Sequence, residues 1–111
     1  MSDIFFPGRD CPVTVLDPGK VSRSLRARGG GLMAVEVVFA SGGVGAVHTH
    51  PHEQISYCLS GSFSYTVEGE TFSLVPGDSV YVAPDLRHGT ACLEAGVLLD
   101  VFSPQRRDFL A

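Results

Sequence analysis

Three of the four histidines in the chain lie within five consecutive residues, at His48, His50 and His52, and Gln54 follows them. In an extended segment, alternate side chains share one face, with the Cα atoms of successive same-face residues about 6.6–6.8 Å apart. Two imidazoles at that spacing can bind one metal ion at about 2.1 Å from each nitrogen. The pattern therefore favours a metal site over the alternative, a polar turn that is merely rich in histidine.

A second chemical feature is Asp100, the one carboxylate in the apolar segment Gly96–Phe102. An ionised, unpaired carboxylate in a buried strand costs roughly several kcal/mol, so Asp100 must face a polar cavity or a hydrogen-bond donor. Phe102 shares its face, and Arg106 follows closely enough to fold back. Two interpretations remain: an Asp–Arg structural pair that closes the fold, or an acid/base carboxylate beside an anion clamp.

The elements that position these residues are predicted to be short β-strands separated by turns rich in glycine and proline, which is typical of a sandwich or barrel. Glu68 and Gly69 predict a tight hairpin. The expected strands are Val13–Leu16, Leu32–Ala40, Gln54–Leu59, Phe63–Val67, Thr71–Val75, Ser79–Ala83, Thr90–Leu93 and Gly96–Phe102. Helix is expected only at the tail, as a turn capped by Ser103, with Pro104 at its first position, that runs through Arg107.

Composition limits the class of protein. The 111 residues, 44% hydrophobic and 18% charged, predict one all-β domain over residues 1–111. A net charge of −4 argues against nucleic-acid binding, and no apolar run approaches the ~18 residues of a membrane span. The N-terminus lacks the features of a signal peptide, and three widely spaced cysteines fit reduced thiols. We therefore expect a cytoplasmic protein that binds neither nucleic acid nor membranes.

The glycine and histidine spacing resembles the two motifs of the cupin family. The first corresponds to Gly42, His48, His50, Gln54 and Gly61, and the second to Gly77 and His88. The resemblance implies a cupin double-stranded β-helix, or jelly-roll barrel, with one divalent metal ion in its mouth. The implied ligands are His48, His50, Gln54 and His88, and the ion is nickel, zinc, iron or manganese.

The chain departs from the family pattern at one ligand position, where the family usually has a glutamate and this chain has Gln54. An amide oxygen can still coordinate a metal, while His52 and Glu53 remain alternatives for completing the set. Three neutral imidazoles and a neutral amide leave the +2 charge of the ion uncompensated, which favours an anionic substrate or an enolate intermediate. The second motif also departs, at Pro84, Asp85 and Cys92.

A finer resemblance is to the KdgF-type cupins of pectin and alginate catabolism, through His48–Gln54, Asp100–Pro104 and Arg106. Those proteins convert 4,5-unsaturated uronate monosaccharides into linear 5-keto-4-deoxyuronates. The resemblance implies a metal-dependent, isomerase-like enzyme that binds a small anionic sugar. Asp100, Phe102 and Arg106 would face the substrate, with Asp100 and Arg106 taking part in catalysis.

Two other functions fit the same residues: a metal-dependent cupin dioxygenase, and a non-catalytic cupin that senses a sugar. We also expect a homodimer, formed through outer sheet faces or through the apolar N-terminal residues Ile4–Phe6. Arg23, Arg26 and Arg28 could attract an anion, but a solvated strand edge is the simpler interpretation.

Overall fold

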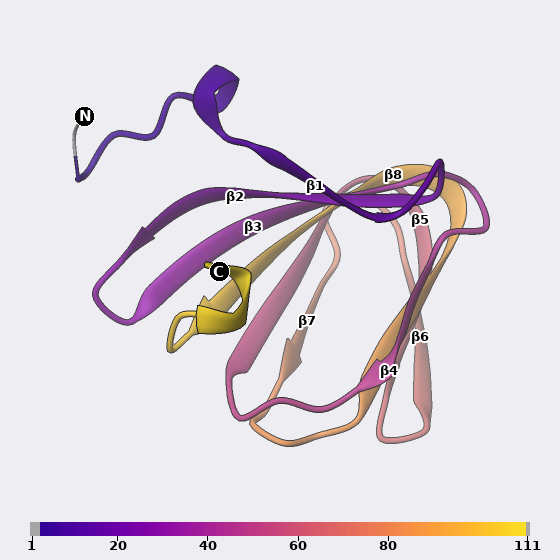
Figure 1. Ribbon diagram of the computed structural model, residues 1–111. Coiled ribbons are helices and arrows are strands. Elements are labelled where there is room, and N and C mark those ends of the chain that lie inside the picture. Colours follow the sequence, from indigo (N-terminus) through magenta and orange to yellow (C-terminus); the bar gives the residue numbers. More distant parts are fainter. Residues whose placement is uncertain (1–2, 111) are drawn as a thin grey trace.

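The computed structural model describes residues 3–110; residues 1–2 and 111 of the predicted domain lie outside the described residues. Within the described range the chain forms eight strands and two short 3-10 turns, which confirms the predicted all-β class (Figure 1). The strands are β1 (Val13–Asp17), β2 (Val21–Gly29), β3 (Leu32–Phe39), β4 (Val44–His48), β5 (Glu53–Val67), β6 (Glu70–Leu74), β7 (Ser79–Val82) and β8 (His88–Ser103). The turns are η1 (Gly8–Asp10) and η2 (Arg107–Phe109).

The sheet folds over into two layers, and the long strands β5 and β8, which pair with each other, run through both of them. One half of β8 pairs with β3, and the other half pairs with β4. Likewise, one half of β5 pairs with β7 and the other with β6. The resulting sheet curls into the predicted jelly roll, but its hydrogen bonding does not close, since the path runs from β1 to β6.

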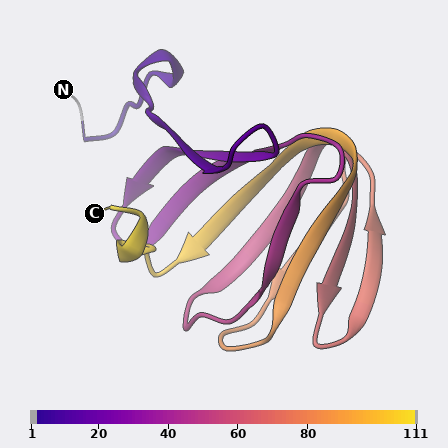
Figure 2. The same cartoon turned by 45° about the vertical axis from the view of Figure 1, so that its right-hand side comes forward.

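Glycines allow β5 and β8 to bend between the layers. Gly61 has a φ of +76°, and a Cβ there would lie 2.5 Å from the carbonyl oxygen of Glu94. Gly96 likewise packs against the backbone of Ser60. Figure 2 shows β8 rising to this bend and turning back. The sequence pattern predicted that each of these two strands would be interrupted near its bend. In the structure both strands continue through it, because register shifts between Cys58 and Phe63 accommodate the bend.

Two strands were not predicted from the sequence. In β2 a register shift between Leu25 and Ala27 interrupts the two-residue alternation that marks a strand. β4 is short and ends at the first histidine of the cluster. The hairpin prediction is confirmed, because Glu68 and Gly69 have φ values of 47° and 83° between β5 and β6.

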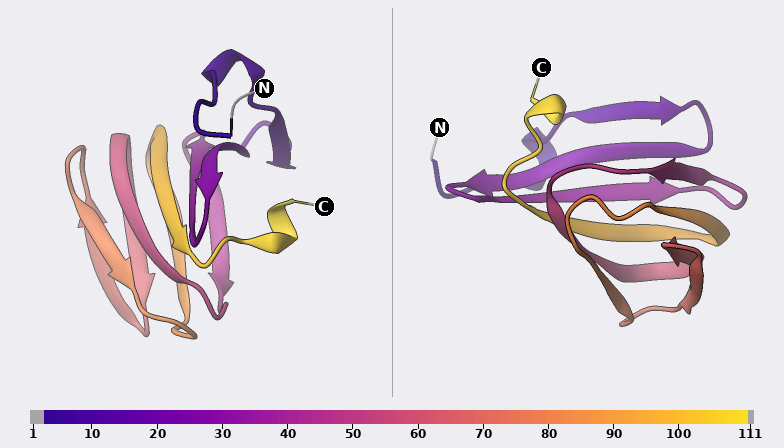
Figure 3. Two further views of the ribbon diagram at one scale, coloured as in Figure 1. Left: turned by 90° about the vertical axis from the view of Figure 1, so that its left-hand side faces the viewer. Right: turned by 90° about the horizontal axis from the view of Figure 1, so that it is seen from below.

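The predicted start of the C-terminal turn is wrong. Ser103 is the last residue of β8, and no helical turn begins at Pro104, so Ser103 caps nothing. The turn instead begins at Arg107, and Figure 3 shows that this segment projects from the end of β8. Within residues 3–110 we find no helix of the length and apolar character needed to cross a membrane.

The core is apolar near the bend and polar toward the opposite end. Phe39 and Phe63 meet edge to face with ring centroids 5.2 Å apart, and Cys58 and Cys92 are buried beside them, as expected for small apolar side chains. Along β5 the inward residues then change from Cys58 to Ser56 and Gln54, all of them buried. A polar interior of this kind needs internal hydrogen-bond partners or a ligand.

Candidate metal centre

The polar end of the fold contains a cavity of about 330 Å³, within the range of small-molecule sites. It brings together side chains from the two layers and from the C-terminal turn. Of the residues predicted from the sequence, it is lined by His48, Gln54, His88, Asp100, Phe102 and Arg106.

Three histidines converge at this cavity. His48 at the end of β4 pairs across the sheet with His88 at the start of β8, and His50 lies in the connection to β5. One ligand nitrogen from each ring lies within 4.8 Å of the others. His50 and His88 are buried, at 8% and 2% exposure, while His48 is exposed. Such a group is compatible with one bound metal ion.

Backbone carbonyls fix which nitrogen of each ring is available. A carbonyl oxygen can only accept, so the Nδ1 atom beside it carries the hydrogen, and a neutral ring keeps a free electron pair on Nε2. The Nδ1 contacts are 2.7 Å from His48 to Ala46, 2.9 Å from His88 to Leu86 and 3.0 Å from His50 to His52. The second nitrogen of all three rings is thus held in the ligating form.

Two features of these electron pairs fit a cation. Nε2 of His88 is buried and has no hydrogen-bond partner. Nε2 of His50 lies 2.9 Å from Oε1 of Gln54, so in the neutral ring two acceptors face each other. Burial also lowers the pKa values of His50 and His88, which favours the neutral, ligating form. The donor set therefore fits a divalent metal ion.

The strand parity used in the sequence argument does not hold, because residues 49–52 form a connection between β4 and β5. His52 contacts the ring of His50, with centroids 5.3 Å apart, but is not part of the three-histidine group. Glu53 is exposed and accepts a hydrogen bond of 3.1 Å from the Tyr81 hydroxyl. Of these three candidates, Gln54 is the one whose ligand atom, Oε1, faces Nε2 of His50, at 2.9 Å.

Asp100 belongs to a hydrogen-bond network on the cavity wall. Ser56 donates to Oδ1 of Asp100 at 2.6 Å, and the Tyr65 hydroxyl lies 2.8 Å from Ser56. Burial raises the pKa of Asp100 to about 6, although its hydrogen bonds with Ser56 and Gln54 counteract the rise. Ser56 and Tyr65 were not predicted from the sequence as site residues. The pattern that could have predicted them is the presence of polar residues at inward positions of an otherwise apolar strand.

Arg106 pairs with Asp108 and not with Asp100. Its Nε and Nη2 atoms donate to the two carboxylate oxygens at 3.0 and 2.8 Å, and these bonds lower the pKa of Asp108. The guanidinium carbon lies 5.1 Å from the ring centroid of Phe102 and 4.2 Å from that of Phe109. Phe102 is itself buried, 3% exposed, with its ring edge-on to His50.

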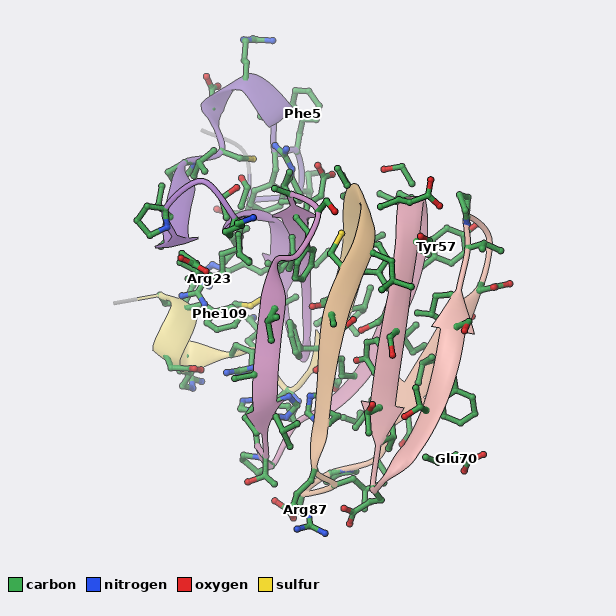
Figure 4. The ribbon with its side chains drawn as sticks, turned by 90° about the vertical axis from the view of Figure 1, so that its right-hand side faces the viewer. Phe5, Arg23, Tyr57, Glu70, Arg87 and Phe109 are labelled. Atoms are coloured by element: carbon green, nitrogen blue, oxygen red, sulfur yellow. The ribbon has the colours of Figure 1, made fainter. Side chains whose placement is uncertain are left out.

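Arg23 of β2 also lines the cavity, contrary to the simpler interpretation of a solvated strand edge. Its guanidinium carbon lies 3.7 Å from the ring centroid of Phe109, and Figure 4 shows the two side chains together. Among residues 3–110, no carboxylate lies within ion-pair distance of Arg23. Burial and then the nearby charge of Arg106 lower the pKa of Arg23, and the charge of Asp108 partly counteracts them.

Comparison with known proteins identifies the family, because the cupin domain matches residues 35–102. This chain belongs to the cupin family. It is 47% identical to the pectin degradation protein KdgF of Dickeya dadantii (strain 3937) over 81 residues, which are 71% of this cupin and 74% of that protein. The resemblance to KdgF-type cupins is therefore confirmed.

Solved structures agree with this assignment. An RmlC-like cupin from Shewanella frigidimarina superimposes with a TM-score of 0.89 at 37% identity, covering 98% of this cupin and 96% of the other chain. KdgF from Halomonas sp. superimposes with a TM-score of 0.88 at 37% identity, covering 95% and 96% of the respective chains.

Proposed function

We propose that this cupin is a metal-dependent enzyme of pectin and alginate catabolism. It would convert 4,5-unsaturated uronate monosaccharides into linear 5-keto-4-deoxyuronates. The observation that supports the proposal is one cavity lined by His48 and His88 of the three-histidine group, by a carboxylate and by two guanidinium groups. Its similarity to a protein named for pectin degradation supports the choice of substrate class.

The charges of the cavity suit a small anion. Asp108 occupies one edge of the Arg106 guanidinium, through Nε and Nη2. A guanidinium has five N–H donors, so the remaining edge can donate two parallel hydrogen bonds to the C6 carboxylate of the sugar. Arg23 adds a positive charge that has no carboxylate partner among the described residues. The two arginines would bind the substrate carboxylate and orient the ring.

The reaction is an isomerisation, so its protons must balance. The C1 hydroxyl loses a proton, the ring C1–O bond breaks as the aldehyde forms, and the ring oxygen leaves as an enol or enolate. C4 then gains a proton as the C5 ketone forms. A bound divalent ion would supply Lewis-acid stabilisation of the negative oxygen.

Asp100 would move a proton in this reaction. Its pKa of about 6 lies near neutrality, so both protonation states are accessible at working pH. Ser56 fixes one carboxylate oxygen by a hydrogen bond of 2.6 Å. The other oxygen is then the one available to the sugar.

The test uses 4,5-unsaturated galacturonate released by a lyase in the same cuvette. Loss of its conjugated absorbance is followed without protein, with the wild type, and with His88→Ala. The wild type is also stripped with a chelator and reloaded with metal, which controls for misfolding of the variant. We expect acceleration above the spontaneous rate, its loss in His88→Ala and in the stripped protein, and recovery on reloading.

Two results would oppose the proposal. A metal-loaded wild type that does not accelerate the reaction excludes this substrate, and oxygen uptake by the iron-loaded protein would then indicate a dioxygenase. A protein that binds the sugar without turnover would instead indicate a sensor.

A further inference from the structure

The amide of Gln54 has two possible orientations, and only one of them presents the carbonyl oxygen to the histidines. In the structure Oε1 lies 2.9 Å from Nε2 of His50. In the opposite orientation the NH₂ group, which cannot ligate a metal, would point there. Some interaction must therefore select the ligating orientation.

The partners of the amide nitrogen supply that selection. Nε2 of Gln54 donates to Oγ of Ser56 at 3.0 Å and to the Tyr65 hydroxyl at 3.4 Å. Ser56 is 0% exposed and Tyr65 is 3% exposed, so water does not compete for these bonds. Both hydrogens of the amide are thus directed away from the histidines.

An ionised Asp100 gives the two hydroxyl hydrogens of the network a consistent assignment. A carboxylate only accepts, so the single hydroxyl hydrogen of Ser56 goes to Asp100. The Tyr65 hydroxyl must then donate to Ser56, which leaves both hydroxyl oxygens as acceptors for Gln54. A glutamate at position 54 would have no hydrogen to donate to Ser56 and Tyr65, as Gln54 does. The amide therefore fits this network.

We propose that Ser56 and Tyr65 are positioning residues that hold the Gln54 carbonyl oxygen toward the metal site and couple this ligand to Asp100. The inference rests on the metal site of the proposed function. It assigns a role to two buried hydroxyl groups that neither bind the metal nor contact its histidines. Partners of this kind typically alter metal affinity by about 10- to 100-fold when removed.

The test measures binding of Co²⁺ to the metal-free protein by its visible absorption and by competition with a chelator. Tyr65→Phe removes one oxygen and keeps the buried ring, and Ser56→Ala removes the other hydroxyl. The matched controls are Tyr57→Phe, on the exposed outer face, and Ser62→Ala, whose hydroxyl is exposed. We expect about 10-fold or greater loss of Co²⁺ affinity and an altered spectrum in the first pair, and no change in the controls.

A double-mutant cycle separates positioning from a general structural effect. If Tyr65 acts through Gln54, Tyr65→Phe weakens Co²⁺ binding in the wild type but not in the Gln54→Ala background. An equal loss in both backgrounds, or no loss in the wild type, overturns the inference. Tyr65→Phe carries the conclusion even if Ser56→Ala does not fold.

The outcomes also separate this inference from the proposed function. Normal sugar turnover by the wild type, with Co²⁺ binding unaffected in Tyr65→Phe, would overturn only the positioning role. A coupled loss of Co²⁺ binding in a protein that does not turn over the sugar would support the positioning role and exclude the substrate. A wild type that does not bind Co²⁺ would overturn both.

Discussion

Arg106 is held by Asp108 from the same C-terminal turn, through two hydrogen bonds of 3.0 and 2.8 Å. The side chain of Arg106 is only 12% exposed, whereas that of Asp108 is 58% exposed. The exposed Asp108 therefore fixes the direction of a nearly buried guanidinium that also lines the cavity. The structural Asp100–Arg106 pair considered from the sequence is replaced by this contact.

Removing the orienting carboxylate should weaken substrate binding. For Asp108→Ala we expect KM for the unsaturated uronate to rise about 3- to 10-fold, because Arg106 loses its fixed direction; tenfold corresponds to about 1.4 kcal/mol. Steady-state kinetics measures this. Glu68→Ala, which breaks the exposed pair with Arg87, is the control. An unchanged KM in Asp108→Ala would show that the contact does not orient Arg106 for binding.

Arg23 should contribute to anion binding although it lies on a different strand. Arg23→Met keeps much of the side-chain volume and removes the charge, so we expect KM to rise about 10-fold with kcat little changed, as for loss of uniform binding. The wild-type KM should also depend more strongly on salt than that of the variant. Arg87→Met is the control, because Figure 4 shows Arg87 at the lower end of the molecule, away from Arg23. A fall in kcat with unchanged KM would contradict this role.

Asp100 should make the metal-free protein less stable as pH rises. Its native pKa of about 6 exceeds the reference value of 3.8, so the folded state binds the proton more tightly than the unfolded state. The free energy of unfolding therefore falls between about pH 4 and 6, by up to about 3 kcal/mol from this group.

The comparison that isolates this effect is Asp100→Asn, followed by urea unfolding across that range. His50 and His88 have lowered native pKa values, so they contribute the opposite slope in both proteins. The difference between wild type and variant should thus carry the slope of Asp100 alone. Parallel stability curves for the two proteins would contradict the raised pKa.

The predicted homodimer stays a prediction, and the outer sheet face offers a surface for it. Ile55, Tyr57 and Tyr81 are 47%, 40% and 57% exposed on paired strands β5 and β7. Apolar residues grouped in this way on an exposed face suit an interface. We expect light scattering to give twice the 11.8 kDa of one chain, and Ile55→Glu to shift the protein toward a single chain. A mass of one chain for the wild type would exclude the dimer.

The sequence by itself was sufficient to predict the all-β class, the β5–β6 hairpin and the residues of the histidine cluster. These features depend on local patterns: alternation within a strand, a glycine in a two-residue turn, and motif spacing. The resemblance to KdgF-type cupins depended on two short motifs, His48–Gln54 and Asp100–Arg106, and comparison confirmed it.

Only the tertiary structure decided which residues share the cavity. Arg23 and Phe109 are far apart in the chain, and the register shift in β2 interrupts the alternation by which a strand is predicted. No local sequence pattern therefore predicted that Arg23 and Phe109 are in contact. The choice of Asp108 as the partner of Arg106 depended on where the C-terminal turn begins. The hydrogen-bond network from Tyr65 to Asp100 likewise depends on the folded sheet, because strand pairing places Ser56 opposite Asp100 and the bend of β5 brings Tyr65 back to Ser56.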